Sequence, residues 1–239
     1  MPEDWQELLT RLERAFGPQH WWPADSPFEV MVGAILTQNT SWTQVERAID
    51  QLREAGLLNA GALLEAAPET LEPLLRCTGY YRLKTRRLQA FCAFLEREGC
   101  LDRPERLGAA DDLYGLRHKL LSVYGVGEET ADSILLYALQ RPIAVVDAYT
   151  RRLAYRLGWT DPKPSYAALQ DRMEGQLPPG DIQKRQELHA LIVVQGKTFC
   201  RSRPSCRECP LRWDCAYGAG QSAAIGNTRS DCGRTEPQR

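Results

Sequence analysis

The stretch that decides the fold is LLSVYGVGEETA, residues 120–131, in which Gly125 and Gly127 separate two helical patterns. Because glycine permits positive φ angles, this pair predicts a tight turn. A helix that starts directly after Gly127 would direct its unpaired amides and the positive end of its dipole at a phosphate. The segment therefore predicts two helices joined by a hairpin, and amides at Gly125, Val126, Gly127 and Thr130 are placed where they can contact a phosphate. A plain helix–helix turn is the other interpretation of this pattern.

Hydrophobic residues at helical spacing flank the hairpin on both sides. Asp4 is placed to cap the first helix, with Glu7 three residues later. The sequence has no long alternation of apolar and polar residues, which is the pattern typical of strands. We therefore expect an all-α protein with short loops marked by glycine and proline. The expected helices cover residues 5–16, 45–52, 60–75, 84–98, 113–123, 128–139, 148–157 and 183–194.

Composition limits the partners and the location. With 43% hydrophobic residues among 239, the chain can form one sizeable unit or two small lobes. Its apolar stretches are far shorter than the roughly 20 residues of a membrane-spanning helix, so we expect a soluble cytoplasmic protein without membrane contact. A net charge of −1 means that any nucleic-acid surface must be local. Basic clusters, which are also typical of solvated helix faces, occur at residues 82–87, 151–156 and 201–212.

A second informative run, PIAVVDAYTRR at residues 142–152, lies one helix after the hairpin. Asp147 precedes a helical pattern, where aspartate commonly serves as a cap. Together, the Gly-Val-Gly hairpin, the next helix and the Val-Asp pair before an arginine-rich helix resemble the helix-hairpin-helix, Gly/Pro-rich, Asp signature of the endonuclease III superfamily. The resemblance extends from about Pro27 to Cys215. It implies a DNA glycosylase acting on damaged double-stranded DNA, with Asp147 as the catalytic residue.

Four of the eight cysteines form the pattern Cys-x5-Cys-x2-Cys-x5-Cys. Four cysteine ligands leave no open coordination position, so the pattern indicates a structural metal site. It resembles the iron–sulfur motif of the superfamily, which implies a [4Fe–4S] cluster that holds the loop with Arg201, Arg203 and Arg207 against the DNA backbone. The family usually has six residues in the first gap, so zinc stays open as an alternative. The expected ligands are Cys200, Cys206, Cys209 and Cys215.

Two further segments match the family. In TQNTSW, residues 37–42, the resemblance implies that Gln38 enters the base stack where the damaged base has left, and that Asn39 and Thr40 shape the same edge. A polar helix end without a ligand is the alternative. The segment CTGYYRLK, residues 77–84, resembles a Gly-Tyr turn followed by a basic helix, which implies phosphate contacts from Arg82 and Lys84.

The sequence departs from part of the family in the second helix of the hairpin. Members that also cleave the DNA strand carry a lysine where this chain has Glu129. The amine of that lysine attacks the sugar and forms a Schiff base. Its absence indicates a monofunctional glycosylase in which Asp147 assists attack by water. Lys84 and Lys197 are possible substitutes for the amine, and no spacing selects either.

Tryptophans suggest the substrate. The segments His20–Pro23 and 37–42 most resemble the 3-methyladenine DNA glycosylase branch, in which aromatic side chains from these places sandwich the flipped base. This implies a base pocket formed by Trp21, Trp22 and Trp42. A 3-alkylated adenine is positively charged and would gain roughly 0.5–2 kcal/mol from cation–π interaction. The alternative is that these tryptophans belong to the core.

These inferences define one expected architecture. Residues 28–139 form a central helical bundle with the hairpin, residues 1–27 and 140–216 form a second lobe with the cysteine cluster, and residues 217–239 form a disordered tail. The active site is expected in the groove between the lobes. We expect a monomer near the nucleoid that hydrolyses N-glycosidic bonds of alkylated bases. The alternatives are a bifunctional glycosylase and lyase on oxidised pyrimidines, and a DNA-binding module without catalysis.

Overall fold

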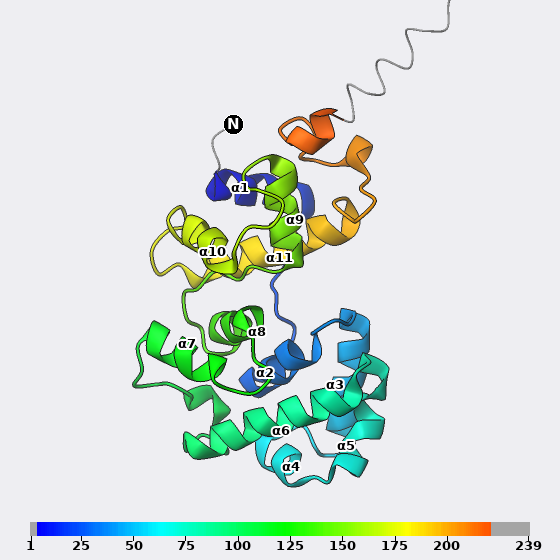
Figure 1. Cartoon of the computed structure of the whole chain (residues 1–239), viewed down its shortest axis with the longest axis vertical. Helices are drawn as coiled ribbons and strands as arrows, with labels where there is room; N and C mark the ends of the chain where they lie inside the picture. Colours follow the sequence, from blue (N-terminus) through cyan, green and yellow to red (C-terminus); the bar gives the residue numbers. More distant parts are fainter. Residues whose placement is uncertain (1–3, 221–239) are drawn as a thin grey trace, which may run out of the picture. The chain divides into compact units, whose positions relative to one another are not determined.

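The computed structural model describes residues 4–220, and all regular secondary structure within them is helical (Figure 1). The all-α prediction is confirmed. No helix in this part of the chain is long and apolar enough to span a membrane. The α-helices are α1 (Trp5–Phe16), α2 (Pro27–Leu36), α3 (Trp42–Glu54), α4 (Ala60–Glu65), α5 (Pro68–Leu75), α6 (Tyr81–Arg97), α7 (Leu113–Leu121), α8 (Glu128–Ser133), α9 (Ala148–Leu157), α10 (Tyr166–Glu174) and α11 (Ile182–Thr198).

Several elements differ from the sequence-based expectation. The helix predicted for residues 60–75 is two helices, because Pro68 cannot donate a helical hydrogen bond and starts α5 instead. The helix predicted for residues 128–139 changes after α8 into a π-helical turn, η3 (Ile134–Ala138). Helices α2 and α10 are absent from the helices expected from the sequence. Residues 216–220 are helical, so the predicted tail starts too early, and its remainder lies outside the described residues.

The chain divides into two compact units. The first unit comprises Met1–Gln19, Val146–Pro179 and Gln186–Arg239, and the second comprises His20–Val145 and Gly180–Arg185. The second unit therefore holds the hairpin and the three tryptophans of the expected base pocket. Asp147 and the four clustered cysteines belong to the first unit.

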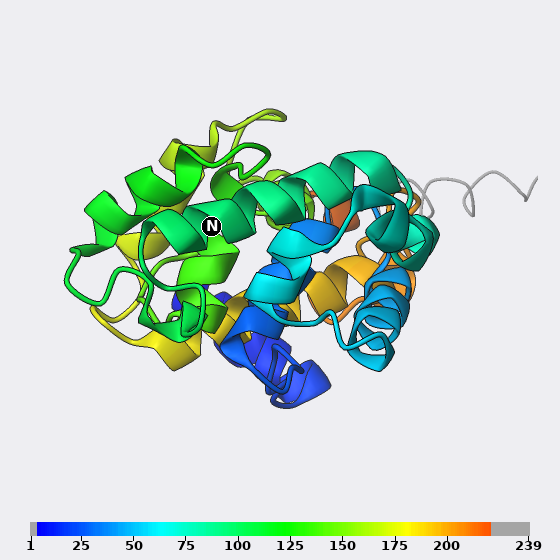
Figure 2. The ribbon, with the colours of Figure 1, turned by 90° about the horizontal axis from the view of Figure 1, so that it is seen from below.

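Helix α2 forms the centre of the second unit. Ser26 caps it by accepting a hydrogen bond from the amide of Glu29, and Pro27 occupies the first turn, where proline is tolerated. Every residue from Phe28 to Leu36 is buried, and α3, α6, α8 and η3 pack around the helix. Helix α6 also packs against α4 and α5 (Figure 2). A helix that is apolar on all sides is stable only at such a central position.

The helix-hairpin-helix consists of α7, the turn through Gly125 and α8. Arg117 of α7 forms an ion pair with Asp132 of α8, with 2.7 Å between Nε and Oδ1 and 3.0 Å between Nη2 and Oδ2. The Asp132 side chain is fully buried. A buried carboxylate is stable only when it is paired, so this ion pair fixes the two helices against each other.

The first unit is built from α1, α9, α10 and the larger part of α11. Asp4 caps α1 as predicted, because its Oδ1 accepts hydrogen bonds from the amides of Gln6 and Glu7. The ring of Trp5 is completely buried and packs edge-on against Trp159 at a centroid distance of 5.0 Å. Helix α9 ends at Gly158, whose left-handed conformation, with φ of 84°, is typical of helix C-termini.

Candidate functional site

Asp147 is both the N-cap of α9 and a buried carboxylate. Its Oδ1 atom accepts hydrogen bonds from the amide of Thr150 over 2.6 Å and from the Thr150 hydroxyl over 2.8 Å. Its Oδ2 atom lies 3.8 Å from Nε2 of His189. Burial by itself would raise the pKa of Asp147, but His189 and Thr150 outweigh burial and hold the pKa below its ordinary value. The carboxylate is therefore ionised at neutral pH.

The backbone that leads into Asp147 is also fixed. The amide of Val146 donates a hydrogen bond to the hydroxyl of Tyr166 over 3.2 Å, and both residues are buried. Tyr166 begins α10, so this bond ties the approach to α9 to a neighbouring helix. Asp147 thus has a defined backbone position as well as a defined side-chain orientation.

Gln38 is bound to the hairpin. Its Nε2 atom donates hydrogen bonds to the carbonyl of Gly125 over 3.0 Å and to the hydroxyl of Thr130 over 2.9 Å, while Arg87 of α6 donates to its Oε1 atom. Gly125 has a φ of +82°, and a Cβ atom there would lie 2.3 Å from Cγ of Arg87. Glycine is therefore required both by the backbone conformation and by the close approach of Arg87.

Asn39 differs sharply from its neighbour. It is exposed and left-handed, with φ of 55°, in the turn between α2 and α3. Within residues 4–220 no partner holds its side-chain amide. Of the two adjacent amides named from the sequence, Asn39 is therefore the one available to a ligand in this structure.

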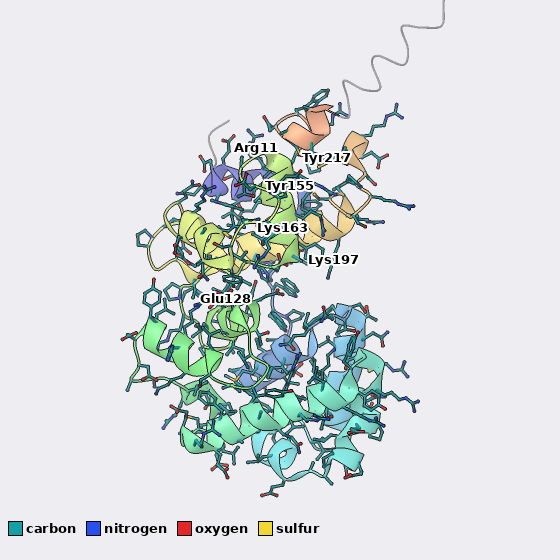
Figure 3. The ribbon with its side chains drawn as sticks, viewed as in Figure 1. Arg11, Glu128, Tyr155, Lys163, Lys197 and Tyr217 are labelled. Carbon is teal, nitrogen blue, oxygen red and sulfur yellow. The ribbon has the colours of Figure 1, made fainter. Side chains whose placement is uncertain are left out.

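The hairpin offers fewer phosphate contacts than the sequence implied. Val126 is buried and its amide donates to the carbonyl of Val123, and Thr130 is buried against Gln38. Gly127 is exposed, and no side chain caps the first turn of α8. That first turn carries two carboxylates, Glu128 and Glu129, both exposed (Figure 3 labels Glu128). Their negative charges repel a phosphate, although they interact favourably with the positive end of the helix dipole.

The predicted basic contacts divide into two groups. Arg82, Arg201 and Arg203 are exposed and can reach a phosphate. Lys84 is not placed for this role, because its side chain is 1% exposed and its Nζ atom donates to the carbonyl of Thr78 over 2.7 Å. Burial, together with the nearby charge of Arg87, lowers the pKa of Lys84 to about 8. The structure therefore corrects the expectation for Lys84, which joins the turn to α6 instead of facing solvent.

The three tryptophans lie together with Tyr137 of η3. Trp21 stacks on Trp22 with 5.5 Å between ring centroids and 13° between planes, and the ring of Trp42 stands at 88° to Trp22 at 5.1 Å. Tyr137 lies 6.2 Å from Trp21 and 5.4 Å from Trp22. Trp22 and Trp42 pack against the core, so the core interpretation holds for part of their surface. The two parallel rings are too close for a base, which needs about 7 Å, or two contact distances.

Gly33 determines how closely Trp22 approaches α2. A Cβ atom on Gly33 would lie 3.1 Å from Cζ2 of the indole. Glycine inside a helix costs about 1 kcal/mol relative to alanine, so its presence in α2 needs a compensating contact. The indole Nε1 atom of Trp22 is buried without a hydrogen-bond acceptor within the described residues. A bound molecule with an acceptor atom could satisfy that donor.

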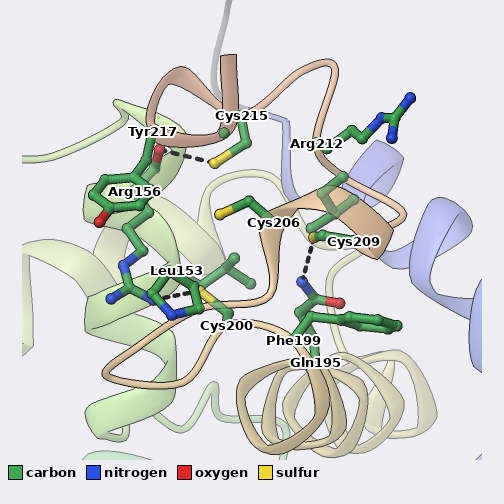
Figure 4. Close-up of a pocket in the computed structure, with 13 residues that line it drawn as sticks. Leu153, Arg156, Gln195, Phe199, Cys200, Cys206, Cys209, Arg212, Cys215 and Tyr217 are labelled. Atoms are coloured by element: carbon green, nitrogen blue, oxygen red, sulfur yellow. Dashed lines mark hydrogen bonds between the residues drawn. The ribbon is translucent and has the colours of Figure 1, made fainter. Parts of the chain in front are cut away.

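The four clustered cysteines line one cavity in the first unit (Figure 4). All four are free thiols. Nη1 of Arg156 donates to Sγ of Cys200 over 3.2 Å, and Nε2 of Gln195 donates to Sγ of Cys209 over 3.1 Å. Burial, followed by the neighbouring thiol groups, raises the pKa of Cys206. Among residues 4–220, no three His, Cys, Asp or Glu side chains are arranged to hold a metal ion as they stand.

Three residues with functional potential were not identified from the sequence. His189 is a single histidine in an apolar helix pattern and gave no signal. Tyr137 lies in the apolar run ILLYAL, which indicates only burial. Tyr80 is 73% exposed and left-handed, with φ of 47°, immediately before the basic helix α6. An aromatic ring after a Gly was the available signal for Tyr80, since exposed rings commonly stack on bases.

The sequence is similar to those of known DNA repair proteins. Residues 32–179 match the HhH-GPD superfamily of base excision DNA repair proteins. A protein of Methanocaldococcus jannaschii that carries the name of a DNA repair glycosylase is 46% identical over 202 residues, covering 84% of this chain and 90% of that protein.

Two solved structures share the fold. A non-covalent endonuclease III–DNA complex aligns with a TM-score of 0.79 and 23% identity, over 93% of this chain and 100% of the other. The H. pylori 3-methyladenine DNA glycosylase bound to 1,N6-ethenoadenine aligns with a TM-score of 0.69 and 24% identity, over 80% of this chain and 96% of the other.

Proposed function

The chain belongs to the HhH-GPD superfamily of base excision DNA repair proteins, and we propose that within it this enzyme is a monofunctional glycosylase for alkylated bases of the 3-methyladenine type in duplex DNA. The family and the M. jannaschii relative identify it as a DNA repair glycosylase. Our proposal concerns the class of substrate and the absence of strand cleavage. The observation that carries them is the aromatic cluster of Trp21, Trp22, Trp42 and Tyr137, combined with a carboxylate at position 129.

Asp147 supplies the catalytic carboxylate. In the reaction, the bond between the sugar carbon and the base nitrogen breaks, a water molecule adds to the sugar carbon, and the water gives up a proton. The ionised Oδ2 atom can stabilise the positive charge that develops on the sugar and accept that proton. A 3-alkylated adenine leaves as a neutral base because it is cationic while bound to the sugar. A buried, ionised carboxylate therefore suffices, and no acid is needed to protonate the leaving base.

The aromatic cluster suits a cationic base. An indole face attracts a cation by roughly 0.5–2 kcal/mol, beyond the stacking that any base receives. In the structure the ring of Trp21 covers one face of Trp22, as a stacked base would. Binding of a flipped base therefore requires that the two rings separate. The unpaired Nε1 donor of Trp22 then gives the base one polar contact.

Glu129 supports a monofunctional reaction. A lyase step needs an amine that attacks the sugar carbon and forms a Schiff base. Glu129 is exposed in the first turn of α8, and its carboxylate cannot form that intermediate. Lys84 is one of the possible substitutes, but its Nζ atom is buried and donates a hydrogen bond to the carbonyl of Thr78. Base release without strand cleavage is the expected outcome.

The four cysteines fit a [4Fe–4S] cluster. Their donor set is entirely sulfur, they line one cavity, and N–H donors from Arg156 and Gln195 point at two of the sulfur atoms, as they do around thiolate-bound clusters. Cys200, Cys206, Cys209 and Cys215 would hold the cluster. When bound, it supplies iron–thiolate bonds that fix the loop carrying Arg201 and Arg203, and we assign no step of base release to it.

Chromatography of released bases tests the proposal. Purified enzyme is incubated with methylated duplex DNA and with duplex DNA containing oxidised pyrimidines, and parallel samples receive sodium borohydride. We expect free 3-methyladenine from the first DNA, intact strands and no trapped protein–DNA adduct. Release of oxidised pyrimidines with a borohydride-trapped adduct would show a bifunctional enzyme instead. Binding without release from either DNA would show a module that has lost catalysis.

A further inference from the structure

The carboxylate of Asp147 has two oxygens with different surroundings. Oδ1 accepts both hydrogen bonds from Thr150, the ordinary arrangement of a helix N-cap. Oδ2 accepts neither of these bonds and lies 3.8 Å from Nε2 of His189. This distance exceeds that of a direct hydrogen bond, and the contact is an ion pair when the imidazole is protonated. The N-cap therefore orients the carboxylate, and the imidazole lies beside the oxygen that remains for chemistry.

Both residues are buried, each with 5% of its surface exposed. Charge interactions are screened much less in such an environment than at the surface. A buried carboxylate alone would tend to take up a proton, and a neutral carboxyl cannot stabilise a cationic sugar. A neighbouring group that favours the ionised form therefore acts directly on catalytic competence.

Helix α11 holds His189 in place along α9. Gly196 lies seven residues after His189 and thus on the same face of α11, two turns further along. A Cβ atom on Gly196 would lie 2.3 Å from Cδ1 of Tyr149 in α9, so the two helices are in close contact there. Arg152 of α9 donates through Nη2 to the carbonyl of Gly196 over 3.4 Å and through Nε to the carbonyl of Cys200 over 2.7 Å. These contacts fix the spacing between the helices that carry His189 and Asp147.

We propose that His189 is a positioning residue for Asp147. The imidazole of His189 keeps the Oδ2 oxygen of Asp147 ionised and directed for reaction with the sugar. His189 acts through the carboxylate and touches no reacting atom. The assignment rests on the proposed catalytic role of Asp147. It predicts that His189 matters only while position 147 carries a negative charge.

A double-mutant cycle tests this dependence. His189→Gln should lower the single-turnover rate of 3-methyladenine release about tenfold, with little change in affinity for the DNA. In the Asp147→Asn background, the same substitution should leave the residual rate unchanged within about twofold, because the charge on which His189 acts is gone. Equal losses in both backgrounds, or no loss in the wild-type background, would overturn the proposal. His118→Gln, at an exposed histidine of α7, is the matched control and should have no effect.

A second measurement needs no substrate. The pKa of the Asp147 carboxyl can be followed by carbon-13 NMR in the intact DNA-free protein, with Asp147→Asn used to assign the signal. His189→Gln should raise that pKa, because the contact that favours the carboxylate is lost, and His189→Asn serves if the glutamine variant does not fold. An unchanged pKa in the folded variant would overturn the proposal. If wild-type enzyme released no alkylated base, the proposed substrate would fail while the NMR result still decided the role of His189.

Discussion

The side-chain amide of Gln38 donates a hydrogen bond to the hydroxyl of Thr130 over 2.9 Å. This bond joins the end of α2 to the first turn of α8, across 92 residues of sequence. With the bonds to Gly125 and from Arg87, it engages both ends of the amide. Gln38 is therefore part of the scaffold of the hairpin, and the adjacent Asn39 is the amide that faces outward.

Substitutions at these two positions should have opposite effects. Gln38→Ala should destabilise the protein by about 2–3 kcal/mol, because it removes three hydrogen bonds, one of them to a charged group. Asn39→Gly should leave stability nearly unchanged, because glycine accepts the left-handed conformation. It should nevertheless reduce base release from duplex DNA, since the side chain that can fill the space of the flipped base is lost. Urea unfolding and single-turnover release on the same preparations distinguish the two.

A stable, fully folded Gln38→Ala variant with impaired release would support the gap-filling role that the sequence predicts for Gln38. Normal release by Asn39→Gly would remove Asn39 from that role. Asn59→Gly is a suitable control for Asn39→Gly, because Asn59 caps α4 and has no assigned contact with DNA.

The stacked tryptophans should also separate stability from substrate binding. Trp22→Ala should cost up to about 3 kcal/mol, because this ring packs against Gly33 and the core. Trp21→Ala should cost about 2 kcal/mol, because it removes the stack on Trp22 and the edge contacts with Trp42 and Tyr137, each worth about 0.5–1.5 kcal/mol. It should still weaken release of 3-methyladenine about tenfold or more, since stacking contributes about 1–3 kcal/mol per base. Thermal unfolding and base release measure the two effects. Strong destabilisation by Trp21→Ala with normal release would assign Trp21 to the core.

Lys84 should leave a signature in the pH dependence of stability. The folded-state pKa is about 8, below the ordinary value of 10.5, so the unfolded chain binds more protons at this site between these pH values. The free energy of unfolding should therefore gain a contribution that rises with pH from about 8 to 10.5. Lys84→Met should remove that rise, and Lys184→Met, at an exposed lysine, should not. Denaturant unfolding over this pH range checks it, and parallel curves for wild type and Lys84→Met would contradict the burial of a charged amine.

Metal content should depend on the clustered cysteines alone. Anaerobically purified protein should be brown and contain about four iron atoms per chain. Cys206→Ala should lose iron and fold poorly, because metal-bound loops depend on the metal. Cys77→Ala, at a half-buried thiol outside the cluster, should keep full iron content. One zinc ion and no iron in the wild type would replace the iron–sulfur assignment with a structural zinc site.

The sequence predicts features that depend on local interactions. Helix periodicity and capping act within a few residues, so α1 and its cap Asp4 agree with the expectation in position and in hydrogen bonding. The break between α4 and α5 has an equally local cause, because Pro68 starts α5. Helix α10 was not predicted, although its buried residues Tyr166, Leu169 and Met173 follow helical spacing and Ser165 caps it.

Features set by distant contacts could not be predicted. A lysine in a basic run is usually exposed, and only the fold brings Nζ of Lys84 to the Thr78 carbonyl. The hydrogen bonding of Gln38 depends on Arg87, which is 49 residues away in the sequence. The position of His189 beside Asp147 depends on how α11 packs on α9, which no motif encodes. The sequence thus identifies Asp147 as a candidate, and the structure supplies the residues that set its charge and direction.

We propose that Asp147 drives hydrolytic release of an alkylated base. The direct test is single-turnover release of 3-methyladenine from methylated duplex DNA by wild type and Asp147→Asn, with DNA affinity measured on both proteins. We expect release by the wild type, a loss of roughly 100-fold or more in the variant, and similar affinity for damaged DNA. Near-normal release by Asp147→Asn, or no release of 3-methyladenine by the wild type, would contradict it.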